Sequence, residues 1–191
     1  MIDKKTILRI LMSLPVLMHW ARTRRTHTPI KLKYILWQKI LRISGKVPWQ
    51  VHWTSKVDGV KDISVGVEVS PGYSPGCYIH GSGGITIGDY TQIAPNVGII
   101  SSNHDPLDGR KKIDGSVHIG SYSWIGMNAV VLPGVTVGDF TVIGAGAVVT
   151  KSFPHGYQVL AGNPAKAVKT LDSSMCIRYR SEYEYVGYHP K

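Results

Sequence analysis

A six-residue period dominates the second half of this 191-residue chain. An aliphatic residue recurs at every sixth position, and glycine follows it in most copies: Ile119, Ile125, Val131, Val137, Ile143 and Val149. This period fits neither an amphipathic helix nor an alternating strand, which repeat about every 3.6 and 2 residues. It is typical of a triangular solenoid, in which six residues form one short strand and one corner. A single coil cannot bury its own apolar face, so successive coils must stack.

The same frame extends back to residue 51, which predicts an all-β solenoid of about five coils. The earlier face positions would be Val51, Val57, Ile63, Val69, Pro75, Gly81, Ile87, Ile93 and Ile99, of which Pro75 and Gly81 interrupt the aliphatic type. Twenty residues separate Ile99 from Ile119 where six would keep the frame, so fourteen are inserted. The insertion lies within the polar segment 103–116, which is expected to loop out of the prism. Loops held on a rigid scaffold often carry function.

Positive charge is concentrated near the N-terminus. Residues 1–57 hold twelve lysines or arginines against one acidic residue, whereas residues 58–191 hold ten against eleven. The net charge of +10 therefore belongs to an N-terminal arm rather than to the solenoid. We expect a basic amphipathic arm over 1–50, the repeats over 51–154, and a C-terminal turn and tail over 155–191. No function is assigned to residues 172–191.

Two amphipathic helices are expected in the arm. Residues 3–20 carry an apolar side that Pro15 interrupts. A second helix is expected to begin at Thr28-Pro29, a cap followed by proline at the first helical position, and to stop at Gly45. The arm is expected to cap the open end of the prism, as repeat proteins require. Peripheral contact with an anionic membrane is a second, compatible role for a basic amphipathic helix. No nucleic-acid-reading motif is present.

The cysteines and the apolar run near the start of the chain indicate where in the cell the protein is expected. Cys77 and Cys176 give neither a disulfide framework nor a metal spacing, so a reduced, cytoplasmic setting is expected, peripheral to the inner face of the membrane if the arm binds lipid. The apolar run over 10–18 is followed by three arginines within 22–25 rather than by a small-residue cleavage site. It is also far shorter than the roughly twenty residues that span a bilayer. Neither a cleaved signal nor a transmembrane helix is predicted.

An ordered set of motifs occupies residues 103–169. After His104 come Trp124-Ile125-Gly126, PGVTVGD at 133–139, IGAGAVVTK at 143–151 and GNPAK at 162–166. In this order and spacing they resemble the hexapeptide-repeat acetyltransferases, which include galactoside and maltose acetyltransferases, and the resemblance covers about 57–171. It implies a left-handed parallel β-helix, acetyl-CoA as co-substrate, no metal, and a homotrimer with coenzyme between adjacent prisms. The left hand comes from the resemblance alone, because generic chirality favours right-handed crossovers.

By this resemblance His104, at the root of the extruded segment, is the catalytic residue. Moving an acetyl group from a thioester to a hydroxyl needs a base for the hydroxyl proton, and imidazole, with an unperturbed pKa of about 6.5, serves near neutral pH. The developing oxyanion needs a donor fixed in advance, and the resemblance assigns the backbone N–H of Met127. Either Asp105 or a backbone carbonyl could orient the imidazole ring.

The resemblance also implies a set of coenzyme-binding positions. Small residues would let the pantetheine arm approach the prism wall, and lysines would meet the phosphates at the nucleotide end. The set comprises Trp124, Gly126, Ala145, Gly146, Thr150, Lys151, Lys166 and Lys169. Trp124 could equally be a packing residue, and Lys166 and Lys169 could be ordinary solvated side chains.

The acceptor is expected to bind where the repeat is least regular. Segment 71–84 of one chain and loop 103–116 of another would hold it, with Tyr73, Ser74, Tyr78 and His80 as candidate contacts. Ser74 stands where galactoside and maltose enzymes carry an acceptor-binding asparagine, and the basic arm replaces their acidic and arginine-rich helices. The expected acceptor is therefore a hydroxyl on a lipid-linked or nucleotide-linked saccharide of bacterial surface-polysaccharide biosynthesis.

Three other functions share part of these sequence features. An amino-sugar N-acetyltransferase is the main alternative, because the same histidine serves oxygen and nitrogen acceptors. A non-catalytic scaffold would not need His104 together with the coenzyme motifs. A gamma-type carbonic anhydrase needs three metal-binding histidines with a closely spaced pair, but no two of His80, His104 and His118 are five residues apart.

Overall fold

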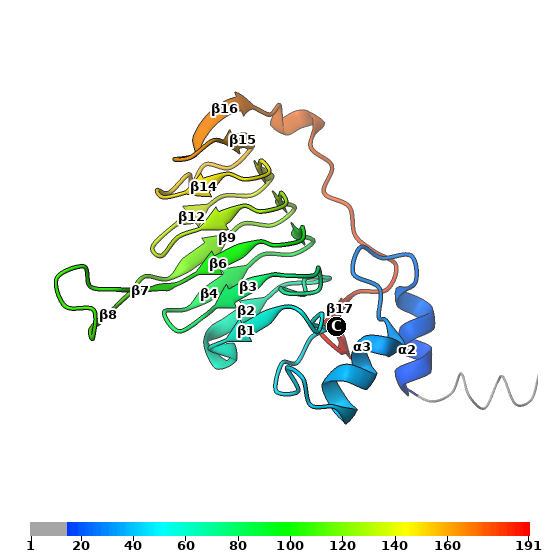
Figure 1. The fold of residues 1–191 in the computed structure, drawn as a ribbon. Helices are drawn as coiled ribbons and strands as arrows, with labels where there is room; N and C mark the ends of the chain where they lie inside the picture. The colour runs from blue at the N-terminus through cyan, green and yellow to red at the C-terminus, as the bar shows by residue number, and fades with distance from the viewer. Residues whose placement is uncertain (1–14) are drawn as a thin grey trace, which may run out of the picture.

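The computed structural model describes residues 15–191, which form short strands stacked in three sheets (Figure 1). Sheet A contains β1 (Lys56–Asp58), β3 (Tyr78–His80), β6 (Gly98–Ile100), β11 (Val130–Val131) and β14 (Val148–Val149). Sheet B contains β2 (Ile63–Val65), β4 (Ile85–Ile87), β9 (Val117–Ile119) and β12 (Thr136–Val137). Sheet C contains β5 (Gln92–Ile93), β10 (Trp124–Ile125), β13 (Thr141–Ile143), β15 (Gln158–Ala161) and β16 (Lys166–Thr170), of which only β16 runs antiparallel.

From β4 to β14 the chain visits sheets B, C and A in turn, and we call one such passage a circuit. After the insertion, strands of successive circuits pair in parallel eighteen residues apart, as Trp124 with Val142 and Val130 with Val148. Across the insertion the step is thirty-two residues, eighteen plus the inserted fourteen, as between Gln92 and Trp124. Apart from Ile93, which is partly buried, the aliphatic residues of the six-residue frame over 87–149 are almost fully buried between the sheets, as Ile99, Ile125 and Val149 show. The predicted frame over residues 87–149 and its parallel stacking are therefore confirmed.

The predicted frame is wrong between residues 69 and 87. Ile79, rather than Pro75, belongs to the column of buried side chains inside the prism, because it pairs with Val57 in the preceding circuit and with Ile99 in the next. Ile85 pairs with Ile63 and is buried, so Gly81 is not a face position either. These registers put twenty-two residues between Val57 and Ile79 and twenty between Ile79 and Ile99, where the predicted frame has eighteen. The extra residues lie in corner loops, which can lengthen without disturbing the stacked strands.

The predicted insertion projects from the edge between sheets A and B, at the left of Figure 1. It folds into a hairpin of β7 (Ser102–His104) and β8 (Lys112–Asp114), which pair antiparallel. Its base stays tied to the prism, since the Gly115 N–H donates to the Ser101 carbonyl at 2.8 Å. The prism therefore presents His104 at the foot of a hairpin rather than in a loose loop.

The arm lies at the end of the prism where the circuits begin, at the lower right of Figure 1. It comprises α2 (Pro15–Thr23), α3 (Leu32–Ile35) and the π-helical turn η1 (Leu36–Ile40). The predicted helix over 3–20 falls partly outside the described residues. The predicted start of the second helix is wrong, because Thr28 donates its hydroxyl to the Glu68 carbonyl at 2.9 Å instead of capping a helix. Its predicted end is also late, since η1 stops at Ile40. Among residues 15–191 no helix combines the length and apolarity needed to cross a bilayer.

One side of α3 and η1 closes the open end of the prism. Tyr34 and Gln38, one helical turn apart, are buried, and the Gln38 amide donates to the Trp49 carbonyl at 2.9 Å. The Gln38 side-chain oxygen accepts the N–H of Val51 at 3.1 Å. Trp49 itself is buried in the core and donates its indole N–H to the Pro71 carbonyl. These contacts support the capping role that the sequence predicts.

The tail returns to the arm along the outside of the prism. It contains the short helices and strands η3 (Ser173–Met175), β17 (Tyr185–Val186) and β18 (His189–Pro190), while η2 (Val60–Asp62) lies in the first circuit. Tyr185 is fully buried and donates its hydroxyl to the Thr28 carbonyl at 2.7 Å. Tyr188 donates its hydroxyl to the side-chain oxygen of Gln38. The tail, which had no assigned role, thus fastens the arm to the prism.

The Gln38→Ala substitution should lower the free energy of unfolding by about 2–4 kcal/mol, because it leaves several buried polar groups without partners. Urea denaturation followed by tryptophan fluorescence would measure this loss. Lys46→Ala, at an exposed position of the same arm, is the matched control and should change stability by less than about 0.5 kcal/mol. Equal effects of the two substitutions would show that Gln38 does not hold the cap.

Candidate active site

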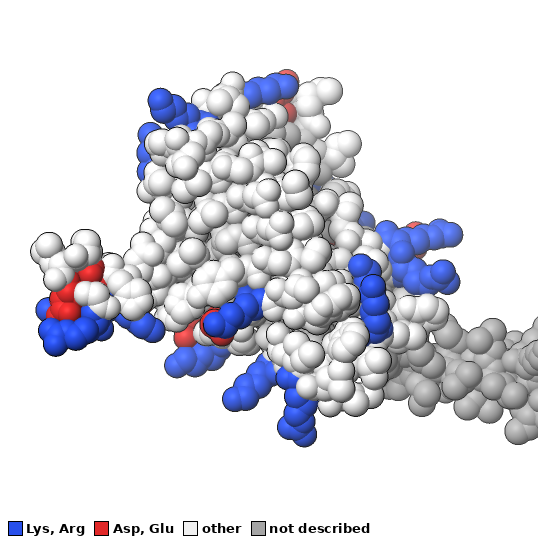
Figure 2. Space-filling view, viewed as in Figure 1, with Lys and Arg blue, Asp and Glu red and all other residues white. Residues whose placement is uncertain are grey.

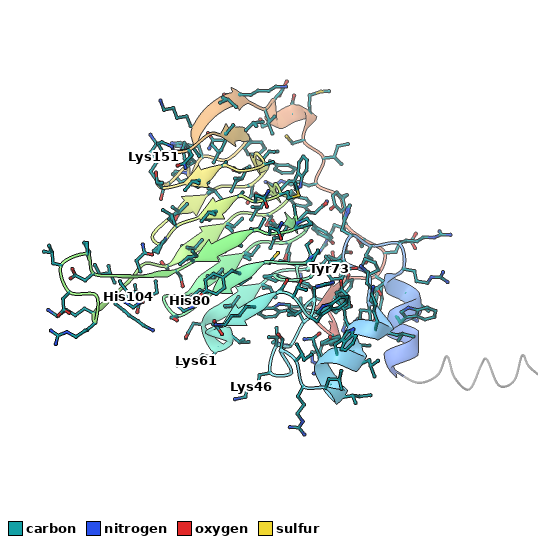
Figure 3. All side chains as sticks on the ribbon, in the orientation of Figure 1. Lys46, Lys61, Tyr73, His80, His104 and Lys151 are labelled. Atoms are coloured by element: carbon teal, nitrogen blue, oxygen red, sulfur yellow. The ribbon has the colours of Figure 1, made fainter. Side chains whose placement is uncertain are left out.

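His104 stands on the A–B edge of the prism, at the end of β7 (Figure 3). Its imidazole is exposed, and Nδ1 lies 2.7 Å from the Gly109 carbonyl oxygen across the hairpin. A carbonyl can only accept a hydrogen bond, so the neutral ring carries its proton on Nδ1 and leaves the Nε2 lone pair free. Of the two orienting groups that the sequence left open, the structure places the backbone carbonyl at the ring.

The hairpin tip holds this carbonyl in place by short-range contacts. Asp105 accepts the N–H of Leu107 at 2.7 Å, which turns its carboxylate away from the imidazole. Asp108 pairs with Arg110 at 2.9 Å on the other side of Gly109. Hydrogen bonds from Arg110 lower the pKa of Asp108, so this pair stays charged. Both contacts shape the turn that presents the Gly109 carbonyl to His104.

The predicted oxyanion donor lies on a different edge, between sheets C and A. Met127 is exposed, and its backbone N–H donates to no acceptor among residues 15–191. One circuit further, Gly146 donates to the Met127 carbonyl at 2.8 Å, so Ala145 and Gly146 continue the same edge. Gly146 has a φ of 69°, and a Cβ built on it would meet no atom within 4 Å. This edge is an open strip of small residues with a free donor, which suits an extended amide-bearing chain such as pantetheine.

The remaining coenzyme candidates are divided among several places. Thr150 and Lys151 are exposed on the A–B edge, two circuits along the prism from His104. Lys166 and Lys169 are exposed on β16, at the end of sheet C opposite the arm (Figure 1). Gly126 is buried, and a Cβ there would lie 2.7 Å from the Ala145 nitrogen, so this glycine allows the next circuit to approach.

A cavity of about 230 Å³ opens where sheet C meets the arm. Trp124 projects from β10 into its lining with its side chain about half exposed. Gln92 stands beside Trp124 because the two residues pair across β5 and β10. The cavity is completed by His27, Thr28, Tyr73, Ser74, Ile93 and Ala94. It offers an aromatic face and several polar groups, a combination that suits a sugar ring.

The four predicted acceptor residues fall into two pairs. Tyr73 and Ser74 line the cavity, but the Tyr73 hydroxyl donates to the Pro29 carbonyl and the Ser74 hydroxyl to the Ile93 carbonyl. Tyr78 and His80 lie on β3 of sheet A with their rings stacked 5.9 Å apart. His80 ends β3 near the A–B edge, on the same side of the prism as His104 (Figure 3). One chain therefore does not bring the four together.

Two cavity residues, His27 and Gln92, were missed in the sequence. His27 Nδ1 lies 3.3 Å from Gln92 Nε2, so the arm and the prism meet in this lining. Gln92 precedes the face residue Ile93 and stands one circuit below Trp124, a relation that the predicted repeat frame gives directly. No periodic signal could place His27, because its position depends on how the arm packs.

Comparison with known proteins confirms the predicted resemblance. The family model described as bacterial transferase hexapeptide (six repeats) matches residues 116–151. Galactoside O-acetyltransferase of Escherichia coli K12 is 37% identical over 105 residues, which cover 52% of this chain and 51% of that protein. The chain spans about half the length of the curated relatives it matches.

Solved structures extend the similarity over most of the chain. The crystal structure of a maltose O-acetyltransferase from Clostridium difficile 630 gives a TM-score of 0.59 at 28% identity, covering 85% of this chain and 89% of that one. Galactoside acetyltransferase in complex with coenzyme A gives the same TM-score at 24% identity, covering 93% and 90%. This last likeness concerns the fold. The protein is thus similar in sequence and architecture to hexapeptide-repeat acetyltransferases.

Proposed function

We propose that this protein transfers an acetyl group from acetyl-CoA to a hydroxyl of a saccharide. The observation that carries the proposal is the imidazole of His104, exposed at the foot of the hairpin with Nδ1 held by the Gly109 carbonyl. This hydrogen bond fixes the tautomer and the ring orientation that a general base needs. Similarity to galactoside and maltose O-acetyltransferases supports the reaction class.

The proposed chemistry needs only groups that this chain supplies. Nε2 of His104 takes the hydroxyl proton while the acceptor oxygen forms a bond to the thioester carbonyl carbon. The free Met127 N–H donates to the carbonyl oxygen as it becomes an oxyanion. When the carbon–sulfur bond breaks, the imidazolium returns its proton to the leaving thiolate. The products are the acetyl ester and free coenzyme A, and His104 is ready for another cycle.

The location of these groups supports a site shared by two chains. His104 stands on the A–B edge, whereas Met127 and the strip that follows it stand on the C–A edge, and sheet A separates the two. We propose a homotrimer in which the A–B edge of each chain faces the C–A edge of its neighbour. For the prism itself we propose the left-handed winding in about five coils that the resemblance implies.

For the acceptor we propose a saccharide of bacterial surface-polysaccharide biosynthesis, bound in the cavity lined by Gln92 and Trp124. Trp124 would stack on the sugar ring, and Gln92 and His27 would bond its hydroxyls. The Tyr73 and Ser74 hydroxyls are engaged with backbone carbonyls, so they would shape the cavity more than contact the sugar. An amino sugar in place of a hydroxyl acceptor is the alternative function.

Replacing His104 by alanine should lower kcat by roughly 10²–10⁴-fold, the weight of a positioned general base, with little change in coenzyme affinity. The release of coenzyme A thiol during acetyl transfer would measure kcat, and calorimetry the affinity. His118→Ala is the matched control, since His118 is an exposed histidine on β9 outside the proposed site. A His104→Ala protein that retains a third of wild-type turnover would exclude this histidine as the base.

The shared site can be tested by mixing two inactive variants. His104→Ala damages the A–B half of a site, and Ala145→Trp blocks the C–A half. In trimers assembled at random from equal amounts of the two chains, about one site in four has both halves intact, so roughly a quarter of wild-type activity should return. Coexpression of two tagged chains followed by an activity assay would measure this. A mixture as inactive as either parent would contradict a site built from two chains.

The acceptor should be found by incubating the enzyme and acetyl-CoA with free sugars, nucleotide-linked sugars, lipid-linked sugars and amino sugars. We expect ester formation on a saccharide hydroxyl, detected by mass spectrometry and by its lability to mild base. Gln92→Ala should raise the acceptor KM roughly tenfold, because a sugar hydroxyl loses its hydrogen bond, and leave the acetyl-CoA KM unchanged. Gln158→Ala, on β15 of the same sheet, is the control. Acetylation of amines alone would favour the amino-sugar alternative.

A further inference from the structure

The helical segment that caps the prism directs its apolar side outward. Leu32, Leu36 and Ile40, each four residues apart, are 43%, 45% and 68% exposed. The opposite side, which carries Tyr34 and Gln38, is buried against the prism. Amphipathic helices of globular proteins normally bury the apolar stripe and expose the polar one. The reversed arrangement leaves a row of large aliphatic side chains without a partner in the described chain.

The turn that follows the helix enlarges this apolar row. Leu41, which directly follows Ile40, is also exposed, as is Ile43 two residues later. Trp53, about half exposed, packs on Trp37 of η1 with the ring centroids 5.6 Å apart. Five large apolar side chains are thus exposed within twelve residues, more than the single ones scattered over ordinary surfaces, and such patches mark interaction sites.

Basic side chains surround the apolar row. The acid that shares a cavity with two of them, Arg42 and Lys46, is Asp58, which pairs with Lys56 instead. Lys33, Lys39, Arg42 and Lys46 are exposed, and the sequence from 4 to 57 contains no aspartate or glutamate. None of the ion pairs formed within residues 15–191 involves these four cations. Burial lowers the pKa of His52, and the charges of Lys33 and Lys31 lower it further.

We propose that this base surface, formed by Leu32, Leu36, Ile40, Leu41, Ile43, Lys33, Lys39, Arg42 and Lys46, docks on an anionic lipid bilayer. Aliphatic side chains can enter the acyl boundary while lysines and arginines extend to lipid phosphates. The charge of these residues favours this occupant, because a surface with four cations and no acid among its own members repels a second copy of itself but attracts anionic headgroups.

The position of the base surface suits such docking. Basic side chains project from the lower end of the molecule in Figure 2, where Lys46 and Lys61 are labelled in Figure 3, whereas β16 lies at the opposite end. Behind the helix an apolar cavity of about 570 Å³ is lined by Ile30, Ile35 and Val47, with Lys39 and Lys46 also in its lining. The surface is therefore at one end of the prism and leaves the three sheets free. In the proposed trimer, prisms with parallel axes would present three such surfaces to one plane, which raises avidity without new contacts.

Vesicle cosedimentation of the full chain tests the proposal. The wild-type protein should bind vesicles of equal parts phosphatidylglycerol and phosphatidylcholine, and its binding to phosphatidylcholine alone should be at least tenfold weaker. Raising the salt from 0.1 M to 0.5 M should weaken binding to the anionic vesicles by a similar factor, because the Debye length shortens. Ile40→Glu should reduce binding roughly tenfold or more, since it places a carboxylate at the acyl boundary.

Ile177→Glu is the matched control, because Ile177 is an equally exposed isoleucine, at 77%, in the tail outside the base surface. Both variants should melt at the wild-type temperature and acetylate a soluble acceptor at the wild-type rate, so membrane docking and catalysis fail or succeed separately. Equal binding by the Ile40→Glu and Ile177→Glu proteins would overturn the proposal. So would light scattering that shows Ile40→Glu dissociating the assembly, since the surface would then join copies of the chain.

Discussion

Hydrogen bonding between successive circuits is the constraint on which this structure depends. Most strands of the prism have only two or three residues, too few to be stable alone. The strands inside each sheet are held by neighbours on both sides, as β10 is by β5 and β13, and the end strands by one neighbour. The interior column of aliphatic side chains adds burial at the same fixed step. The sequence repeat therefore reflects the stacking of the circuits. At the two ends of the stack, where a circuit has a neighbour on one side only, the repeat must give way to other structure.

The sequence predicts the regular part of this stack well and its ends poorly. From Ile87 to Val149 each interior residue follows from counting, because a slip of one residue would turn a buried side chain outward. Below Ile87 the corners lengthen, and counting in sixes places Pro75 where the register puts Ile79. The placement of a proline on a face already argued against the frame there, because proline has no backbone N–H to donate to the neighbouring strand. The start of the capping helix was missed because Thr28 bonds to Glu68, a contact that only packing creates.

The candidate site shows the same division between local and tertiary information. The position of His104 follows from the length of the insertion, and its ring orientation from a turn five residues long. To assign each coenzyme candidate to an edge of the prism, the repeat frame must be followed through the three faces of a circuit. That count puts Met127 and Gly146 on one edge and Lys151 on another, although the motifs are continuous in the sequence. The repeat could not predict the cavity beside Trp124. One of its lining residues, His27, belongs to the arm, and the repeat does not specify how the arm packs.

The cap and the base surface are two consequences of one helix orientation. The Gln38 side chain bonds to the backbone at Trp49 and Val51, and the Tyr188 hydroxyl holds it from the tail. Turning the helix to bury Leu36 and Ile40 would leave those buried polar groups unpaired, which costs more than a few exposed aliphatic residues. The cap therefore explains why this side is outside, but it does not explain why the outside is apolar. Capping alone is compatible with lysine or glutamate at positions 32, 36 and 40, so the leucines and the isoleucine point to a contact beyond the chain.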